Sequence, residues 1–135
     1  MLKKKKSVSR SKIISRLDSE FSKYIRTRKS VNGYSTCYTC GKNDHWKKLQ
    51  AGHFQSRKHY STRWDEINVQ VQCAGCNIFK SGEQFMFSKQ LDIEYGSGVA
   101  DELYHKAHLT QKFSTVDLLE LLEHYKSINK ASGLI

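Results

Sequence analysis

Apolar residues return at every third or fourth position over the first part of the chain. Between Ser11 and Lys29 they occupy Ile13, Ile14, Leu17, Phe21, Tyr24 and Ile25. A helix has about 3.6 residues per turn, so this spacing places them in one stripe and predicts an amphipathic helix. Most Lys and Arg residues of the segment fall outside the stripe. We therefore expect the stripe to pack on the rest of the protein.

The pattern changes to alternation in the middle of the chain, where it predicts strands. Residues 34–38 and 46–54 predict two short strands on either side of a polar turn at 42–45, and a long loop follows at 55–66. Apolar and polar residues then alternate over 67–72. This alternation is typical of a strand that is buried on one face only.

Helical periodicity returns after this strand. One helix is predicted at 77–95, ending at Gly96, and a second at 100–109. A third begins near Ser114, which with Asp117 resembles a capping box with Asp in place of Glu. Its apolar positions are numerous enough for a helix that is buried or faces a partner. Strands in the middle and helices at both ends predict the α+β class.

The positive charge of the chain is concentrated at its N-terminus. The 135 residues carry a formal net charge of +10, and residues 1–30 hold 11 of the 23 Lys and Arg residues against two acidic ones. Such a segment suits a polyanion such as nucleic acid, although it can also simply solubilise a protein. We expect residues 1–10 to form a disordered basic arm that binds DNA through Lys3, Lys4, Lys5, Lys6 and Arg10.

No stretch of the sequence is long and apolar enough to span a membrane. The basic start is not followed by the apolar segment of a signal peptide. We therefore expect a cytoplasmic protein, whose thiols stay reduced and can bind metal.

The four cysteines are arranged as two pairs. Cys37 and Cys40 form one Cys-x-x-Cys pair and Cys73 and Cys76 form the other, with 32 residues between the pairs. Each pair is a tight turn that directs both sulfurs to one point, and two such pairs match a tetrahedral structural zinc site. A first pair in a hairpin and a second at a helix start is the treble-clef arrangement.

Three residues between and just after these pairs suit phosphodiester hydrolysis. That reaction needs a base that activates water and a divalent cation that neutralises charge on the phosphate and the leaving oxygen. A neutral imidazole can be the base, and an Asn carbonyl on the next strand can orient it. An oxygen donor at the start of a helix can bind a hard cation. His53, Asn68 and Asn77 occur in this order, which also describes a ββα-metal nuclease.

The motifs at residues 51–54, 65–69 and 72–77 resemble the HNH (ββα-metal) endonuclease superfamily. Most of the chain, from the N-terminal helix to residues 123–126, resembles more closely the lambda-phage NinG family, also called Rap, of recombination endonucleases. The resemblance implies a phage or prophage protein in a bacterial host. It further implies cleavage of branched DNA such as Holliday junctions and D-loops, with structural Zn²⁺ and catalytic Mg²⁺ or Mn²⁺.

One position departs from the HNH pattern. HNH enzymes commonly carry an Asp before the catalytic His as a metal ligand, and this chain has Gly52 there. Asn77 alone is a poor magnesium site, so we expect Asp65, in the loop before Asn68, to complete it. Glu66 and His59 are weaker candidates. Alternatively His53 is itself a metal ligand, which leaves the base unassigned.

The sequence thus predicts one zinc-stabilised HNH-type domain at 11–135, with an N-terminal helix at 11–30, a zinc ββα core at 34–96 and C-terminal helices at 98–135. Arg57, Lys58 and Arg63 flank the expected site and are predicted to contact DNA phosphates. The alternatives are a non-catalytic zinc nucleic-acid-binding module and a protein-interaction adaptor. A homodimer through 114–130 is also expected, because a junction resolvase must cut two strands.

Overall fold

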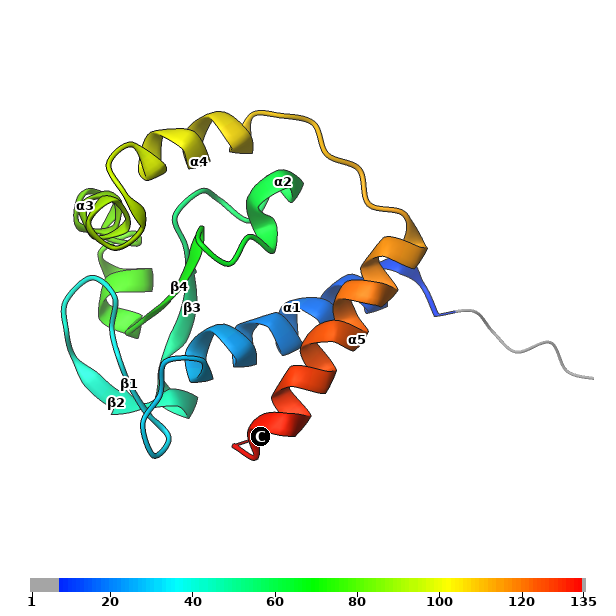
Figure 1. Cartoon of the computed structure of the whole chain (residues 1–135), viewed down its shortest axis with the longest axis horizontal. Helices are drawn as coiled ribbons and strands as arrows, with labels where there is room; N and C mark the ends of the chain where they lie inside the picture. The colour runs from blue at the N-terminus through cyan, green and yellow to red at the C-terminus, as the bar shows by residue number, and fades with distance from the viewer. Residues whose placement is uncertain (1–7, 135) are drawn as a thin grey trace, which may run out of the picture.

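The computed structural model describes residues 8–134 and has a mixed α+β fold. A pair of central strands lies between two helices from the ends of the chain and two helices that follow the second cysteine pair (Figure 1). The helices and strands, in chain order, are α1 (Arg10–Thr27), β1 (Tyr34–Thr36), β2 (Asn43–His45), a 3-10 turn (Trp46–Lys48), β3 (Gln50–His53), α2 (Tyr60–Arg63), β4 (Val69–Gln72), a π-helical turn (Gly75–Phe79), α3 (Gln84–Tyr95), α4 (Val99–Ala107) and α5 (Thr115–Ser132).

The strands form two separate antiparallel pairs. β1 pairs with β2 in a hairpin, and β3 pairs with β4 in a register that places His53 opposite Val69. The predicted polar turn at 42–45 is therefore wrong, because residues 43–45 are strand β2. The predicted strand at 46–54 begins with a 3-10 turn instead, since the N–H of Leu49 donates to the carbonyl of Trp46.

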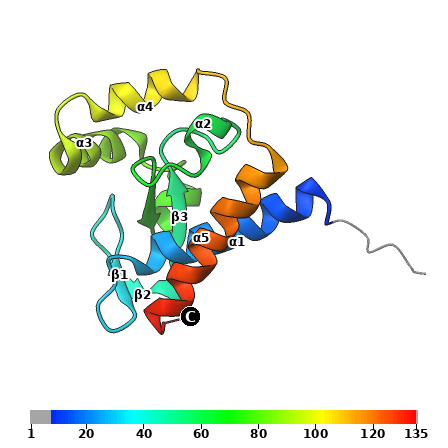
Figure 2. The same ribbon diagram turned by 45° about the vertical axis from the view of Figure 1, so that its right-hand side comes forward.

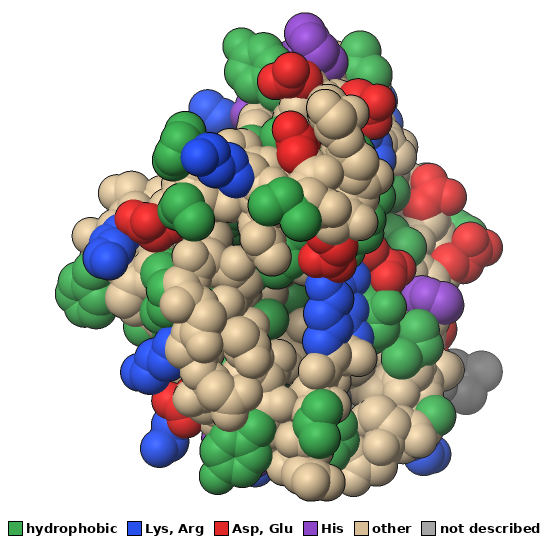
Figure 3. Space-filling view, turned by 60° about the vertical axis from the view of Figure 1, so that its left-hand side comes forward, with side chains coloured by type: hydrophobic (Ala, Val, Ile, Leu, Met, Phe, Trp, Pro, Cys, Tyr) green, Lys and Arg blue, Asp and Glu red, His purple; other side chains and the backbone are tan. Residues whose placement is uncertain are grey.

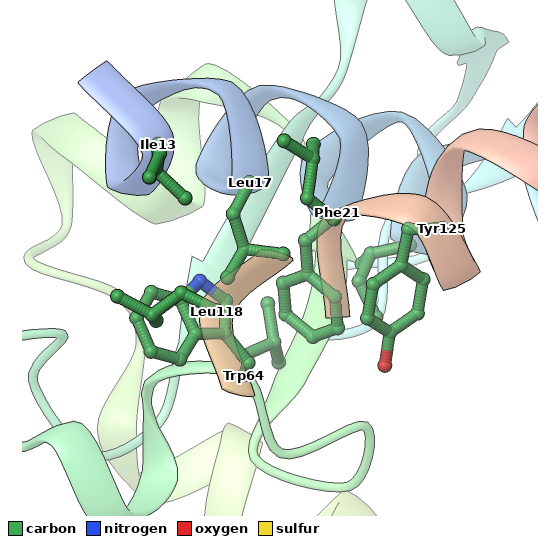
Figure 4. Packing of buried hydrophobic residues seen from close by; sticks show 9 residues of the cluster. Ile13, Leu17, Phe21, Trp64, Leu118 and Tyr125 are labelled. Atoms are coloured by element: carbon green, nitrogen blue, oxygen red, sulfur yellow. The ribbon is translucent and has the colours of Figure 1, made fainter. Parts of the chain in front are cut away.

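The main hydrophobic core joins the first helix to the last. The predicted stripe of α1 is confirmed, and it packs against α5, which lies alongside it in both ribbon views (Figures 1 and 2). Trp64 fills the space below the two helices (Figure 4). The capping box of Ser114 and Asp117 is also confirmed, and Ser9 caps α1. The buried residues of this core are Ile13, Leu17, Phe21, Ile25, Trp64, Val69, Leu118, Leu122 and Tyr125.

The prediction that the 67–72 strand is half-buried is wrong. All four residues of β4 are buried, including Gln70 and Gln72. Their side-chain amides can be buried because other segments supply hydrogen-bond partners. Gln70 accepts from Arg28 and donates to the carbonyl of Ile67, and Gln72 donates to Thr39 and to the carbonyl of Gly82.

The predicted continuous helix at 77–95 is also wrong. A π-helical turn ends at Phe79, and α3 starts only at Gln84. Between them Ser81 and Glu83 adopt left-handed backbone conformations that no α-helix contains. The N–H of Gly82 donates to the carbonyl of Cys76, so the break folds back onto the second cysteine pair. The predicted end at Gly96 is confirmed, because Gly96 caps α3.

Residues 1–7 of the predicted basic arm lie outside the described residues, and Arg10 is the first residue of α1. Within residues 8–134, no helix has the length and apolar character needed to cross a membrane.

Candidate functional site: a cysteine cluster beside a histidine cavity

The four cysteine sulfurs lie close together in the structure. All four Sγ atoms lie within 4.8 Å of one another, and those of Cys40 and Cys73 are 3.6 Å apart. Tetrahedral Zn–S bonds of about 2.3 Å separate sulfurs by about 3.8 Å. None of the four forms a disulfide. The cluster is therefore consistent with a zinc site formed by Cys37, Cys40, Cys73 and Cys76.

Backbone hydrogen bonds explain how two distant segments meet there. The turn after β1 is closed by the N–H of Gly41, which donates to the carbonyl of Cys37. The N–H of Tyr38 donates to the carbonyl of Val71, which docks this turn on β4. β4 then leads directly to Cys73, whose sulfur accepts from the N–H of Cys76.

The thiols of this cluster do not ionise alike. Burial raises the pKa of the Cys76 thiol to about 12. Burial also raises the pKa of Cys37, but hydrogen bonds from the backbone of Cys73 and from Thr39 oppose it and bring that pKa to about 6. Four thiolates at this distance repel one another unless a cation balances them. A zinc ion is the natural counter-charge.

A second feature lies between α1 and the end of β3. It is a cavity of about 310 Å³ that brings together two of the predicted site residues, His53 and Asn77, with Arg57 at its edge. Asp18 and Ser22 of α1 complete its polar lining. Polar groups from three segments thus converge on one hollow, as in binding and catalytic sites.

His53 is held in a defined orientation. Its Nε2 lies 2.9 Å from the backbone carbonyl of Arg63. A carbonyl can only accept, so Nε2 carries the proton and Nδ1 keeps the lone pair in the neutral ring. Burial lowers the pKa of His53 below its usual 6.5, and the positive charge of Arg57 acts in the same direction. The ring is therefore neutral at pH 7, as a base must be.

Asn68 acts on the loop and not directly on the imidazole. It is fully buried before β4, and its Oδ1 accepts from the N–H of Gln55, 2.7 Å away. Its Nδ2 donates to the carbonyls of Gln55 and Thr62. The expected contact with His53 is replaced by two anchors of the loop that carries the Arg63 carbonyl.

Asn77 lines the cavity with one amide oxygen available. Its Nδ2 donates to Oε1 of Gln50, 2.8 Å away, and within residues 8–134 its Oδ1 has no hydrogen bond. A neutral oxygen of this kind suits Mg²⁺ or Mn²⁺ as one ligand among waters and substrate oxygens.

The structure does not bring Asp65 to this cavity. Its Oδ1 accepts from the N–H of Ile67 and of Asn68, and its Oδ2 pairs with Lys106 of α4 at 2.5 Å. Asp65 therefore closes the turn before β4 and ties α4 to it. The weaker candidates also lie outside the cavity lining. Glu66 accepts from Tyr24 and Tyr125, and His59 precedes α2 and packs against His108.

Position 52 holds a glycine, and the space that a larger side chain would need there is filled by the side chain of Gln72. A Cβ on Gly52 would lie 1.8 Å from Oε1 of Gln72, which is completely buried. An Asp at this position has no room while Gln72 is present.

The three predicted phosphate contacts of the loop differ in their surroundings. Arg57 and Lys58 are exposed, and Arg57 also lines the cavity. Arg63 instead has its guanidinium on Asp18, with a side chain only 13% exposed. The face that carries α3 and the hairpin mixes charges of both signs with hydrophobic side chains (Figure 3). That face therefore offers no broad basic surface.

Asp18 is the residue of this region that the sequence pattern did not reveal. It comes from α1, outside the cysteine frame, and reaches the cavity because α1 packs along β3. Its signal in the sequence was faint: an acidic residue beside the apolar stripe of an otherwise basic helix.

The fold and the cysteine cluster define a small α+β protein with a four-cysteine cluster that is consistent with a zinc site. The model of the family described as Bacteriophage Lambda NinG protein matches residues 1–133, so the chain belongs to the NinG family. The expected resemblance to the NinG family is confirmed over nearly the whole chain. Comparison with curated proteins and with solved structures gives no match.

Proposed function

We propose that this protein is a zinc-stabilised, Mg²⁺- or Mn²⁺-dependent endonuclease of the HNH (ββα-metal, treble-clef) type. Its substrates are branched DNA such as Holliday junctions and D-loops, in the cytoplasm of a bacterial host. The observation that supports this proposal best is the orientation of His53. The Arg63 carbonyl holds Nε2–H, which leaves Nδ1 free to accept a proton in a polar cavity.

In this mechanism His53 takes a proton from water that attacks the phosphorus. Asn68 keeps the loop in place through Gln55 and Thr62 and so preserves the hydrogen bond that His53 donates to the Arg63 carbonyl. Arg57, exposed at the cavity, pairs with the negative phosphate. None of these groups reads base sequence, which suits an enzyme that selects DNA by its shape.

Asn77 would hold the catalytic cation, with waters and phosphate oxygens as further ligands. When bound, Mg²⁺ or Mn²⁺ supplies neutralisation of the phosphate and of the leaving 3′-oxygen. The carboxylate of Asp18 lines the same cavity but already accepts from Arg63 and Trp64, so it suits support of the site better than direct coordination.

The test is cleavage of a synthetic four-way junction and a matched linear duplex, with Mg²⁺ and with chelator. Zinc-bound wild-type protein is expected to cut the junction when Mg²⁺ is present and not when chelator is present. His53→Ala should lose on the order of a hundredfold in rate while binding the junction normally. His124→Ala, which removes an exposed histidine on α5, is the matched control and should cut at the wild-type rate.

Two outcomes would favour the alternatives. Junction binding without cleavage under every cation condition indicates a non-catalytic nucleic-acid-binding module. Absence of salt-dependent DNA binding indicates a protein-interaction adaptor.

A homodimer through α5 remains a prediction. The inner face of α5 is taken up by α1, whereas Val116 and Leu119 are exposed and available to a second copy. Light scattering of the protein with and without the junction measures the subunit number.

A further inference from the structure

The carboxylate of Asp18 accepts hydrogen bonds from the side chains of two consecutive residues, Arg63 and Trp64. Its Oδ1 accepts from Nε of Arg63 at 3.1 Å and from Nε1 of Trp64 at 3.0 Å, and its Oδ2 accepts from a terminal nitrogen of Arg63 at 2.5 Å. One carboxylate therefore holds the side chains of two consecutive residues, Arg63 and Trp64, on either side of the peptide group that joins them. The side chains of Asp18, Arg63 and Trp64 are all partly or fully buried, where such charge-assisted bonds are strong.

The carbonyl of that same peptide group is the partner of His53. Arg63 contributes its backbone oxygen to Nε2 of the imidazole, while its guanidinium reaches Asp18 and the carbonyl of Arg57. An acceptor that is fixed in place selects one tautomer of a neutral imidazole and one ring orientation. The position of this acceptor depends on Asp18.

We propose that Asp18 and Arg63 are positioning residues for His53, and that α1 is thereby part of the catalytic apparatus. This inference rests on the proposed nuclease function for its effect on rate, but its effect on the imidazole stands without it. Arg63 is then not the phosphate contact that its sequence position suggested. Its donors are directed into the protein, while Arg57 and Lys58 remain at the surface.

The tautomer of His53 is the direct readout. Long-range ¹⁵N–¹H correlation spectra of zinc-bound, ¹⁵N-labelled protein at pH 7.5 separate a protonated Nε2 from a protonated Nδ1. Wild-type His53 is expected to carry its proton on Nε2 alone. Asp18→Asn keeps the shape but removes the charge that holds Arg63 and Trp64, so a mixture of both tautomers is expected. Asp101→Asn, an exposed acid on α4, is the matched control and should leave the spectrum unchanged.

Kinetics of junction cleavage give the second readout. Asp18→Asn should lower kcat about tenfold or more with little change in KM, the scale on which loss of an orienting partner acts. Arg63→Met should do the same, and the double variant should be no slower than the slower single variant, because both changes break one unit. If Asp18→Asn does not fold, Arg63→Lys tests the same contact with the carboxylate left intact.

Two results would overturn the inference. One is an unchanged tautomer and rate in Asp18→Asn. The other is a loss of junction affinity in Arg63→Met that adds to the effect of Asp18→Asn, which is the behaviour of an independent phosphate contact. If the wild-type protein does not cleave any junction, the proposed function fails, whereas the tautomer spectra still decide the role of Asp18.

Discussion

Adding a single methyl group at Gly52 tests whether the Gln72 side chain leaves room for any side chain at this position. In Gly52→Ala the new Cβ would meet Oε1, Cδ and Cγ of Gln72 at 1.8, 2.6 and 3.0 Å. Three successive atoms are too close, so the whole Gln72 side chain must move. The backbone of Gly52 is not left-handed, so crowding alone is tested.

The cost follows from what Gln72 gives up. Its Nε2 donates to Thr39 at 3.0 Å and to the carbonyl of Gly82 at 2.9 Å, and each bond contributes about 1 kcal/mol. Its Oε1 has no hydrogen-bond partner among the described residues, so moving that atom loses nothing more. Overpacking adds about 1–3 kcal/mol. Replacing glycine returns about 0.5–1 kcal/mol by restricting the unfolded chain. The net loss is roughly 2–4 kcal/mol.

Urea and thermal unfolding of the zinc-bound protein measure this loss. A destabilisation of about 3 kcal/mol lowers Tm by about 10 °C in a domain of this size. Gly75→Ala is the control, because its Cβ would meet only the Cys73 sulfur at 3.7 Å, an ordinary contact. In the double variant with Gln72→Ala, Gly52→Ala should cost less than it does alone. A Gly52→Ala protein within about 0.5 kcal/mol of wild type would refute the packing argument.

Four further predictions concern the zinc site, the general base His53, the loop that Asn68 anchors and the basic N-terminal arm. Metal analysis should find about one zinc per chain, and Cys76→Ser should unfold or aggregate the protein; a zinc-free protein with an unchanged fold contradicts the zinc site. Because only neutral imidazole accepts a proton and burial lowers the pKa of His53, junction cleavage should rise with pH and reach half its plateau below pH 6.5; a midpoint above 7 contradicts this. Asn68→Ala should slow cleavage less than His53→Ala does and raise protease sensitivity at the 55–62 loop, since it removes three loop hydrogen bonds; equal protease resistance argues against the anchoring role. Deleting residues 1–6 removes four lysines and should flatten the log–log salt dependence of DNA affinity by up to roughly 3 to 4; an unchanged slope shows that the arm does not bind.

Local patterns predicted much of this fold. The stripe of α1 and the box at Ser114 depend on residues within a few positions of one another, and both are confirmed. The clustering of the cysteines was also predictable, because each Cys-x-x-Cys turn is local and one metal accounts for all four sulfurs. His53 and Asn77 were singled out because they lie between and just after these turns, and both line one cavity.

Three of the misses, namely the burial of β4, the break before α3 and the role of Asp18, share a physical cause, which is dependence on distant partners. β4 is buried on both faces because Arg28 and Thr39 provide hydrogen bonds for its glutamines. The break before α3 forms where Gln72 holds the carbonyl of Gly82. Asp18 reaches Arg63 across 45 positions of sequence. No periodicity within a segment contains such information.

The pairing of α1 with α5 has a consequence for how the protein is made. Asn129 donates to the carbonyl of Glu20, so the ribosome must add 109 residues before these two partners in the main core can meet. Contacts of such long range form late and slowly. The part of the apolar stripe of α1 that packs on α5 therefore stays uncovered until α5 has been synthesised.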